Sequence, residues 1–392
     1  MTRVIKDGWL TGYLAYTQNH EAPENFHLWS ALATLSGAIR RNIWIDKGYY
    51  TLYPNLYIVL VAETAECRKS AAASIGVKFL RCISDVNIIQ GRITPEAMLA
   101  NMNRSHTNGN GVISQRSDIF IYASEMAATF GKAAYVEELI VLLTELFMTD
   151  HFDYETRNKG KFKIEGPCPT LLGATQPDWV VSGLGRLGRD IGIMNRIVFV
   201  PEKIRKMRLT TYTMTQADIN LKDALENDIC HIAELSGPMI WSKDAYATYD
   251  DWYMTKPDAK GHNIQDEFMA REHDIALKIA MLLSISINDD LIILQGEMEA
   301  AIKLVNIIRN GISCTFMASG GTDEARIGMK IMRSIEKYGP TDRSQLLRRH
   351  YHLIRDARQF DGILDILISQ GILERTKTMV GALYSIKQDE TL

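Results

Sequence analysis

Continuous apolar runs of strand length alternate with helical segments through the middle of the chain. The runs are Leu56–Val61, Ile119–Tyr122, Thr170–Thr175 and Arg196–Val200. Apolar residues at three- and four-residue spacing predict the helices between them, Ser70–Cys82, Pro95–Asn103 and Val136–Phe147. Strands that are apolar on both faces and alternate with helices indicate an α/β fold with a mostly parallel sheet.

The pattern is helical on both sides of this block. The same spacing predicts helices over Trp9–Thr17 and Phe26–Ile39 before it, and over Asp266–Ile287 and Gly296–Ile312 after it. We therefore expect an N-terminal helical segment before the sheet and a helical lid region after it.

A small, flexible stretch, Ala318–Thr322, predicts a domain boundary. Beyond it the pattern predicts three helices and a hairpin: Glu324–Tyr338, Arg343–Tyr351, Arg355–Ser369, and strands Ile372–Lys377 and Ala382–Ile386. Three helices followed by a β-hairpin indicate a winged-helix domain. The expected division is an N-terminal helical segment, an α/β core, a helical lid and a winged helix, at residues 1–45, 46–215, 216–317 and 323–392.

Composition narrows the class of protein. The net charge is −3, so nucleic-acid binding has to use local patches rather than a global field. The five cysteines form no C-x-x-C pair, which argues against a disulfide framework or a zinc cluster and favours a reducing compartment. We find no signal peptide and no apolar run long enough for a membrane helix, and we expect a cytoplasmic protein without membrane contact.

The strongest local signal follows the Leu56–Val61 run and precedes a predicted helix. Glu63–Ser70 ends in Lys69-Ser70 and has the length of a phosphate-binding loop. In such a loop backbone amides and the helix N-terminus face the phosphates of ATP, the lysine reaches the terminal phosphates, and the serine holds Mg²⁺. The residues expected to contact the nucleotide are Thr64, Ala65, Glu66, Cys67, Arg68, Lys69, Ser70 and Ala71.

The two glycines of the standard loop are missing. Glu63 and Arg68 stand in their places, where a positive φ and a close backbone approach favour glycine. The alternative interpretation is a surface loop between strand and helix that happens to contain Lys-Ser.

In addition, the chain resembles a family of phage, plasmid and genomic-island P-loop ATPases that are associated with helicases or primases and are related to ring-forming replicative helicases. The motifs that carry the resemblance occur in order over about residues 25–290: Trp29–Ala33, Tyr53–Tyr57, Cys67–Ser70, Leu172–Pro177 and Asn195–Val200. The resemblance implies a Mg²⁺-dependent ATPase that acts on DNA, assembles as a homo-oligomeric ring of six subunits, and works with a primase or another replication protein.

Glu125 follows the Ile119–Tyr122 run, where the family has an acidic pair. The resemblance implies that Glu125 activates the attacking water as a general base. Ser124 stands where the family has Asp and brings no charge. The alternative is that Glu125 only caps the helix that follows it.

Three further positions are candidates for contacts with the nucleotide. Gln176 ends the third run and is either a sensor of the γ-phosphate or a turn residue before Pro177. The resemblance implies that Arg196 is an arginine finger supplied to a neighbouring subunit. Arg186 and Arg189 are alternatives for that role, or contacts for DNA phosphates. Arg271 reaches the nucleotide from the lid or is an ordinary helix-surface residue.

The C-terminal segment carries a local excess of basic residues. The expected contacts with DNA phosphates are Arg343, Arg348, Arg349, Arg355, Arg358, Arg375 and Lys377. Asp361 and Asp365 make the third helix less basic, which argues against sequence readout through it. A winged helix can also serve as a protein-docking module.

The leading interpretation is therefore a helicase- or translocase-like ATPase of a mobile element. Two alternatives stay open: a non-hydrolysing DNA-binding initiator or helicase loader built on a degenerate P-loop scaffold, and an interaction module that engages a protein partner.

Overall fold

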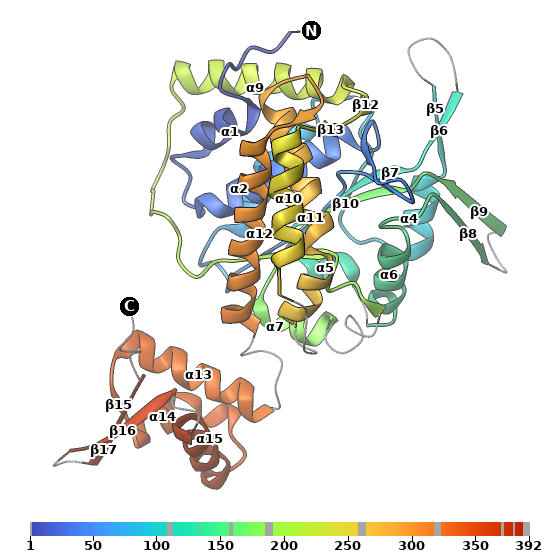
Figure 1. Cartoon of the computed structure of the whole chain (residues 1–392). Coiled ribbons are helices and arrows are strands. Elements are labelled where there is room, and N and C mark those ends of the chain that lie inside the picture. Colours follow the sequence, from blue (N-terminus) through green and yellow to red (C-terminus); the bar gives the residue numbers. More distant parts are fainter. Residues whose placement is uncertain are drawn as a thin grey trace. The chain divides into compact units, whose positions relative to one another are not determined.

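A parallel sheet of five strands forms the centre of the longer of two compact units into which the chain divides, Met1–Ser313 and Cys314–Leu392 (Figure 1). The prediction of an α/β fold with a parallel sheet is confirmed. The computed structural model describes residues 2–107, 113–131, 133–156, 160–184, 191–257, 264–316, 323–369, 372–378 and 381–386.

The strands of this sheet are, in spatial order, β11 (Ile197–Pro201), β3 (Tyr57–Val61), β10 (Cys168–Thr175), β7 (Asp118–Ala123) and β4 (Ile88–Gln90). Each neighbouring pair is parallel. The register pairs Val61 with Thr175 and Gly173 with Ala123, so β10 lies between β3 and β7. The loops that leave these three strands therefore emerge together at one end, which we call the carboxyl end of the sheet. The opposite end is the amino end.

Helices cover both faces of the sheet. On one face, α2 (Glu24–Ile39) and α3 (Lys69–Leu80) pack together, and the Ser36 hydroxyl of α2 lies 3.0 Å from that of Thr170 on β10. Side chains alternate between faces along a strand. Gly173, an odd number of residues from Thr170, therefore faces the other side, where a side chain would collide with Met126 of α5 (Met126–Phe130).

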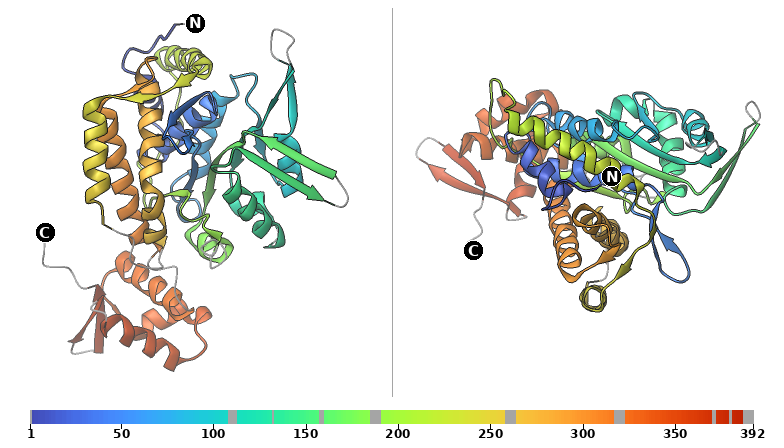
Figure 2. Two further views of the ribbon diagram at one scale, coloured as in Figure 1. Left: turned by 45° about the vertical axis from the view of Figure 1, so that its right-hand side comes forward. Right: turned by 90° about the horizontal axis from the view of Figure 1, so that it is seen from above.

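The remaining helices of the first unit are α1 (Trp9–Thr17), α4 (Pro95–Met102), α6 (Ala133–Glu145), α7 (Pro177–Trp179), the π-helix η1 (Val180–Leu184), α9 (Gln216–Glu234), α10 (Lys243–Thr255), α11 (Ile264–Ile287) and α12 (Gln295–Phe316). Short strands are β1 (Ile43–Asp46), β2 (Thr51–Leu52), β12 (Gly237–Pro238), β13 (Ile240–Trp241) and β14 (Ile292–Ile293). Two hairpins project from the body of the unit, β5–β6 (Arg104–Thr107, Ile113–Arg116) and β8–β9 (His151–Thr156, Gly160–Glu165) (Figure 2).

The N-terminal helices pack with the predicted lid rather than forming a segment of their own. The backbone amides of Val4 and Ile5 donate to the carboxylate of Asp228 on α9, and the Trp9 indole donates to the Leu225 carbonyl at 3.0 Å. The segments expected at 1–45 and 46–215, and most of 216–317, thus share one compact unit. The expected linker at 318–322 lies outside the described residues.

The second unit contains α13 (Asp323–Tyr338), β15 (Thr341–Asp342), α14 (Arg343–His350), the 3₁₀ helix η2 (Tyr351–Leu353), α15 (Ala357–Ser369), β16 (Leu373–Thr378) and β17 (Gly381–Ile386). The strands form an antiparallel sheet in the order β15–β17–β16. Ile327, Ile331 and Ile335 recur every four residues on α13, so they share one face of the helix and pack into the core of this unit.

Across the described ranges, no helix combines the length and apolar character that crossing a membrane requires. Within the same ranges, no group of His, Cys, Asp and Glu side chains is arranged to hold a metal ion.

Candidate functional site

The loop between β3 and α3 adopts the backbone that its missing glycines would favour at one of the two positions. Arg68 has φ 52° and ψ 35°, in the left-handed region, and directly precedes α3. Ala65 also has a positive φ, of 59°. Each such residue costs about 1 kcal/mol or more without glycine. The surroundings must therefore hold this loop in place.

Two side chains from distant parts of the chain contact the loop and stabilise this conformation. Glu21 accepts from Arg68 at 2.7 Å, and Arg205 donates to the Ala65 carbonyl at 3.0 Å. Glu21 also accepts from the Leu209 backbone amide. This hydrogen bond and the one from Arg68 lower the pKa of the Glu21 carboxyl. Neither residue was predicted, because no sequence signal links position 21 or 205 to a loop so far away.

The backbone amides of the loop form a set of hydrogen-bond donors without partners. Six of them make no hydrogen bond within the described part of the chain, those of Thr64, Ala65, Cys67, Arg68, Lys69 and Ser70. The Cys67 side chain is buried, which raises the pKa of its thiol to about 11. Of the predicted nucleotide contacts, Cys67 thus has only its backbone to offer, whereas the loop as a whole offers donors suited to an anion.

Lys69 is the first residue of α3 and is only 8% exposed. Its ammonium turns back over the loop and donates to the carbonyls of Ala62 at 2.5 Å and Glu63 at 3.1 Å. Burial lowers the pKa of Lys69, and the nearby carboxylate of Glu125 opposes that shift. The ammonium of Lys69 is therefore held by carbonyls of the loop rather than by solvent.

Ser70 and β7 are joined by two hydrogen bonds. The Ser70 hydroxyl donates to the Ser124 carbonyl at 2.8 Å, and the Tyr122 hydroxyl donates to the Ser70 carbonyl at 3.1 Å. The start of α3 is thus fixed against the carboxyl end of β7. The Ser70 hydroxyl keeps its oxygen lone pairs for a further partner such as a cation.

Glu125 is the residue that precedes α5, and its carboxyl group is half-buried. It makes no capping hydrogen bond of standard geometry, but the nearby Ala127 backbone amide acts to lower its pKa. Burial raises the pKa of Glu125, and the charge of Lys69 partly offsets that rise. A carboxylate with a raised pKa beside a buried ammonium suits proton transfer.

Gln176 follows the last residue of β10 and precedes α7. The Ala62 amide donates to the Thr175 carbonyl at 3.3 Å, so the end of β10 lies beside the start of the loop. Gln176 therefore lies between the loop and Glu125, because β10 lies between β3 and β7.

Arg196 and Arg271 lie elsewhere. Arg196 directly precedes β11, whose first residue pairs with Tyr57 at the amino end of β3. Four strand residues, roughly 13 Å, separate that level from the loop. Arg196 donates to the Gly192 carbonyl and the Asn195 side chain, and burial and the nearby charge of Arg271 lower its pKa to about 10. Arg186 and Arg189 lie outside the described residues.

The amino end also contains a second buried lysine, which the sequence did not single out as a site. Lys278 of α11 is fully buried and donates to the carbonyl and side-chain oxygens of Asn55 at 2.9 and 2.8 Å. Its ammonium also lies 3.9 Å from the centre of the Phe147 ring. Arg271, from the same helix, contacts the Met148 sulfur at 3.0 Å and therefore belongs to this end.

The basic residues of the second unit differ in their freedom to bind phosphate. Arg343 pairs with Asp361 through two contacts of 2.6 and 2.8 Å, and Arg349 lies over the Tyr338 ring at 4.1 Å. The side chain of Lys377, on β16, is outside the described part of the structure. The remaining predicted contacts are exposed, namely Arg348, Arg355, Arg358 and Arg375.

The structure brings Lys69, Ser70, Glu125 and Gln176 to the carboxyl ends of three adjacent strands, and leaves Arg196 and Arg271 at the amino end. In open parallel sheets, ligands bind outside the carboxyl ends of the strands. No protein-family model matches this chain, and no curated protein is significantly similar to it.

Proposed function

We propose that the chain is a Mg²⁺-dependent ATPase of the P-loop type. The observation that carries the proposal is the pairing of a buried Lys69 with a loop that has six amides without partners, directly before α3. These donors and the helix N-terminus suit a triphosphate, which has to be held by many donors of fixed direction.

Each residue at the carboxyl end then has a role. Lys69 contacts the terminal phosphates, Ser70 and the Ser124 carbonyl region accommodate Mg²⁺, Glu125 accepts a proton from the attacking water, and Gln176 contacts the γ-phosphate. Bound Mg²⁺ supplies charge that offsets the phosphate oxygens. The ion pair between Arg68 and Glu21 keeps the loop in its left-handed conformation.

The proposed activity is that of a helicase- or translocase-like motor in the DNA replication of a phage or mobile element, with a primase or similar replication protein as a partner. In this proposal Arg196 is the finger of a neighbouring subunit in a homo-oligomeric ring, a hexamer. Its distance from its own loop supports a role in trans. Elution size with and without ATP and Mg²⁺ tests the ring: a change to an oligomer on adding nucleotide is expected, and a monomer under both conditions contradicts it.

A coupled ATPase assay tests the enzyme itself. Wild type is expected to turn over ATP only with Mg²⁺, and Lys69→Ala is expected to lose at least about 100-fold in kcat, the scale for losing one fixed donor to developing charge. Lys243→Ala is the matched control, because Lys243 is an exposed lysine on α10. Equal turnover in wild type and Lys69→Ala, or none in either, contradicts the proposal.

A second function is favoured by two positions. Ser124 brings no charge beside Glu125, and Glu63 stands where the first glycine is usual. A DNA-binding initiator or helicase loader that binds ATP without hydrolysing it would retain the loop but not need an acidic pair. Tight nucleotide binding without turnover in wild type would favour this function over the motor.

We also propose that the second unit is a winged-helix domain that contacts DNA phosphates. A helix, a short strand, two further helices and a two-stranded hairpin in this order, with exposed Arg348, Arg355 and Arg358, support the proposal. Replacing these three by Ala in the full chain is expected to lower DNA affinity and to reduce the slope of log affinity against log salt by about 1 for each lost phosphate contact. Arg343→Ala is the control, since its charge pairs with Asp361. An unchanged slope in the triple variant would favour a protein-docking role instead.

A further inference from the structure

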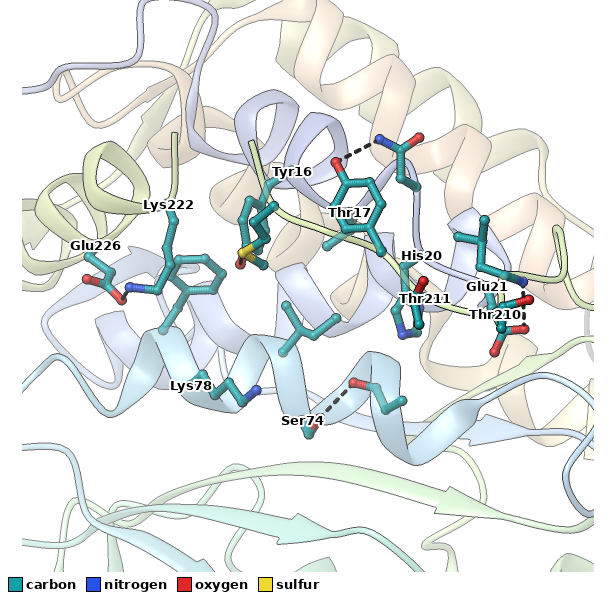
Figure 3. Close-up of a pocket in the computed structure, with 17 residues that line it drawn as sticks. Tyr16, Thr17, His20, Glu21, Ser74, Lys78, Thr210, Thr211, Lys222 and Glu226 are labelled. Atoms are coloured by element: carbon teal, nitrogen blue, oxygen red, sulfur yellow. Dashed lines mark hydrogen bonds and ion pairs between the residues drawn. The ribbon is translucent and has the colours of Figure 1, made fainter. Parts of the chain in front are cut away.

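A cavity of about 450 Å³ lies beside α3, between that helix, the end of α1 with the turn after it, and the 209–214 segment (Figure 3). Ala71, Ser74, Ile75 and Lys78 line it at three- and four-residue spacing, so one face of α3 runs along its whole length. Its volume is in the range of small-ligand sites. Of the residues that line the cavity, the sequence predicted only Ala71 as a contact for the nucleotide.

The cavity and the phosphate loop share a wall. Ala71 is in the first turn of α3, two residues after Lys69. Glu21 lines the cavity, pairs with Arg68 of the loop at 2.7 Å and accepts from the Leu209 amide at 3.2 Å. One end of the cavity is thus next to the loop. In Figure 3 Glu21 and Thr210 lie at that end, and Lys222 and Glu226 lie at the opposite one.

The chemistry of the walls changes along the cavity. Away from Glu21 the lining includes Tyr16, Ile75, Phe79 and Met214, and the Tyr16 and Phe79 rings meet edge to face at 5.7 Å. These side chains are apolar or aromatic; the charged Lys78, Lys222 and Glu226 also line the cavity, the last two as an ion pair at 2.5 Å. A mostly apolar lining with aromatic rings and a few polar groups suits an aromatic base.

The 209–214 segment that closes the cavity is itself held in place. The Tyr212 hydroxyl accepts from the Asn19 amide at 3.1 Å and donates to Asp218 of α9 at 2.8 Å. The Lys206 ammonium donates to the Gln18 carbonyl at 3.0 Å. The segment is therefore tied to both neighbouring elements, and a wall held in place in this way reduces the cost of ordering it around a ligand.

We propose that this cavity takes the nucleoside part of ATP, with the ribose near Ala71 and Glu21 and the base between α3 and the aromatic side chains. The inference rests on the proposed function, because it assigns the phosphates of the same molecule to the loop. The N-terminal turn and the 209–214 segment then determine the affinity for the nucleoside, and the loop determines the affinity for the phosphates.

Filling the cavity tests the assignment. Thr211→Trp places a large ring into it from the exposed segment, and Ile75→Trp does so from α3. Thr213→Trp is the matched control, since Thr213 is an exposed neighbour that does not line the cavity. Binding of Mg²⁺-ATP and of inorganic tripolyphosphate is measured by calorimetry for each variant of the full chain.

Both filled variants are expected to bind ATP at least about tenfold more weakly and tripolyphosphate as wild type does, whereas Lys69→Ala is expected to lose both ligands. Wild-type ATP affinity in Thr211→Trp and Ile75→Trp, with both ligands still bound by wild type, overturns the nucleoside assignment alone. If wild type binds neither ligand, the proposed function fails and the assignment with it. Because tripolyphosphate binding requires a folded loop, its retention also shows that a filled variant is folded.

Discussion

Two lysines are buried at opposite ends of the same sheet, and their partners differ. Lys69, at the carboxyl end, is 8% exposed and donates to two carbonyls of a loop. Lys278, at the amino end, is fully buried and donates to both oxygens of Asn55, itself inside the core. Asn55 in turn donates to the Phe147 carbonyl, so this contact joins several elements.

Under the proposed function, this difference separates a lysine placed for a ligand from one placed for the fold. The hydrogen bond from Lys69 to the Glu63 carbonyl is only part-buried, so water can take the place of the ammonium there when it moves toward a phosphate, whereas the bond to the Ala62 carbonyl is buried. The oxygens of Asn55 have no water to replace Lys278, and leaving a buried polar group unsatisfied costs about 1–3 kcal/mol. Burial alone therefore does not identify a functional lysine, and the nature of its partners does.

The largest expected effect is on kcat and comes from Arg196, the basic residue at the amino end to which the proposed function gives a catalytic role. Arg196→Ala is expected to lower kcat by about 10³- to 10⁵-fold, the scale of an arginine finger, with ATP affinity nearly unchanged. Mixing Arg196→Ala with Lys69→Ala subunits is expected to restore part of the turnover, because some interfaces then combine an intact Lys69 with an intact Arg196. Unchanged kcat, or a mixture as inactive as its parts, would assign Arg196 to the fold together with Lys278.

Glu125→Gln is expected to lower kcat by about 10²- to 10⁴-fold, the usual contribution of a general base, while ATP still binds. Because burial raises the pKa of Glu125 above its usual range, protonation begins at a higher pH than for an exposed glutamate. The wild-type rate should therefore fall on the acid side of the pH profile as Glu125 becomes protonated, and that fall should be absent in the Gln variant. An identical acid limb in both proteins would contradict the assignment.

Lys278→Met is expected to affect stability rather than turnover. At pH 10 the loss of two hydrogen bonds should reduce the free energy of unfolding by about 2–4 kcal/mol, measured by urea denaturation. Lys69→Met should lose less in the same experiment, since one of its two hydrogen bonds is only part-buried. Equal losses in the two variants would remove the distinction between the two lysines.

The pH dependence of unfolding sharpens this comparison. Burial lowers the pKa of Lys278 to about 7, against 10.5 for an ordinary lysine. Between these values the unfolded chain binds more protons than the folded one, so wild-type stability should rise with pH from about 7 to 10.5. Below pH 7 the cost of burying the charge is fully present. The rise should be smaller in Lys278→Met, and an equal rise in both proteins would exclude Lys278 as its source.

Much of the parallel sheet was predictable, because strands buried on both faces are read directly from continuous apolar runs. The predicted run Leu56–Val61 corresponds to β3, Thr170–Thr175 to β10, and the predicted helix Trp9–Thr17 matches α1 in full. The short edge strand β4 and the two projecting hairpins were not predicted, since their alternation is brief or their residues are polar. Helix α9 has a mostly polar surface, which also weakened its signal.

The residues of the candidate site were predictable only from their positions next to strands in the sequence. Lys69 and Ser70 are adjacent to one strand, and Glu125 and Gln176 follow two others, so the parallel topology alone brings them together. The same topology places Arg196, which opens a predicted strand, at the opposite end of the sheet from these residues. Arg271 could not be placed in this way, because the sequence does not say at which end of the sheet a residue on a distant helix will lie. Glu21 and Arg205, which hold the left-handed loop, act over more than 40 and more than 100 residues and leave no local signal.

The central claim is that Lys69 is placed for a ligand and Lys278 for the fold. Calorimetric affinity for Mg²⁺-ATP in wild type, Lys69→Met and Lys278→Met tests it directly, under conditions where all three proteins are folded. We predict binding about 10- to 100-fold weaker in Lys69→Met, from the loss of a charged hydrogen bond to phosphate, and wild-type affinity in Lys278→Met. Equal affinity in wild type and Lys69→Met would contradict the account.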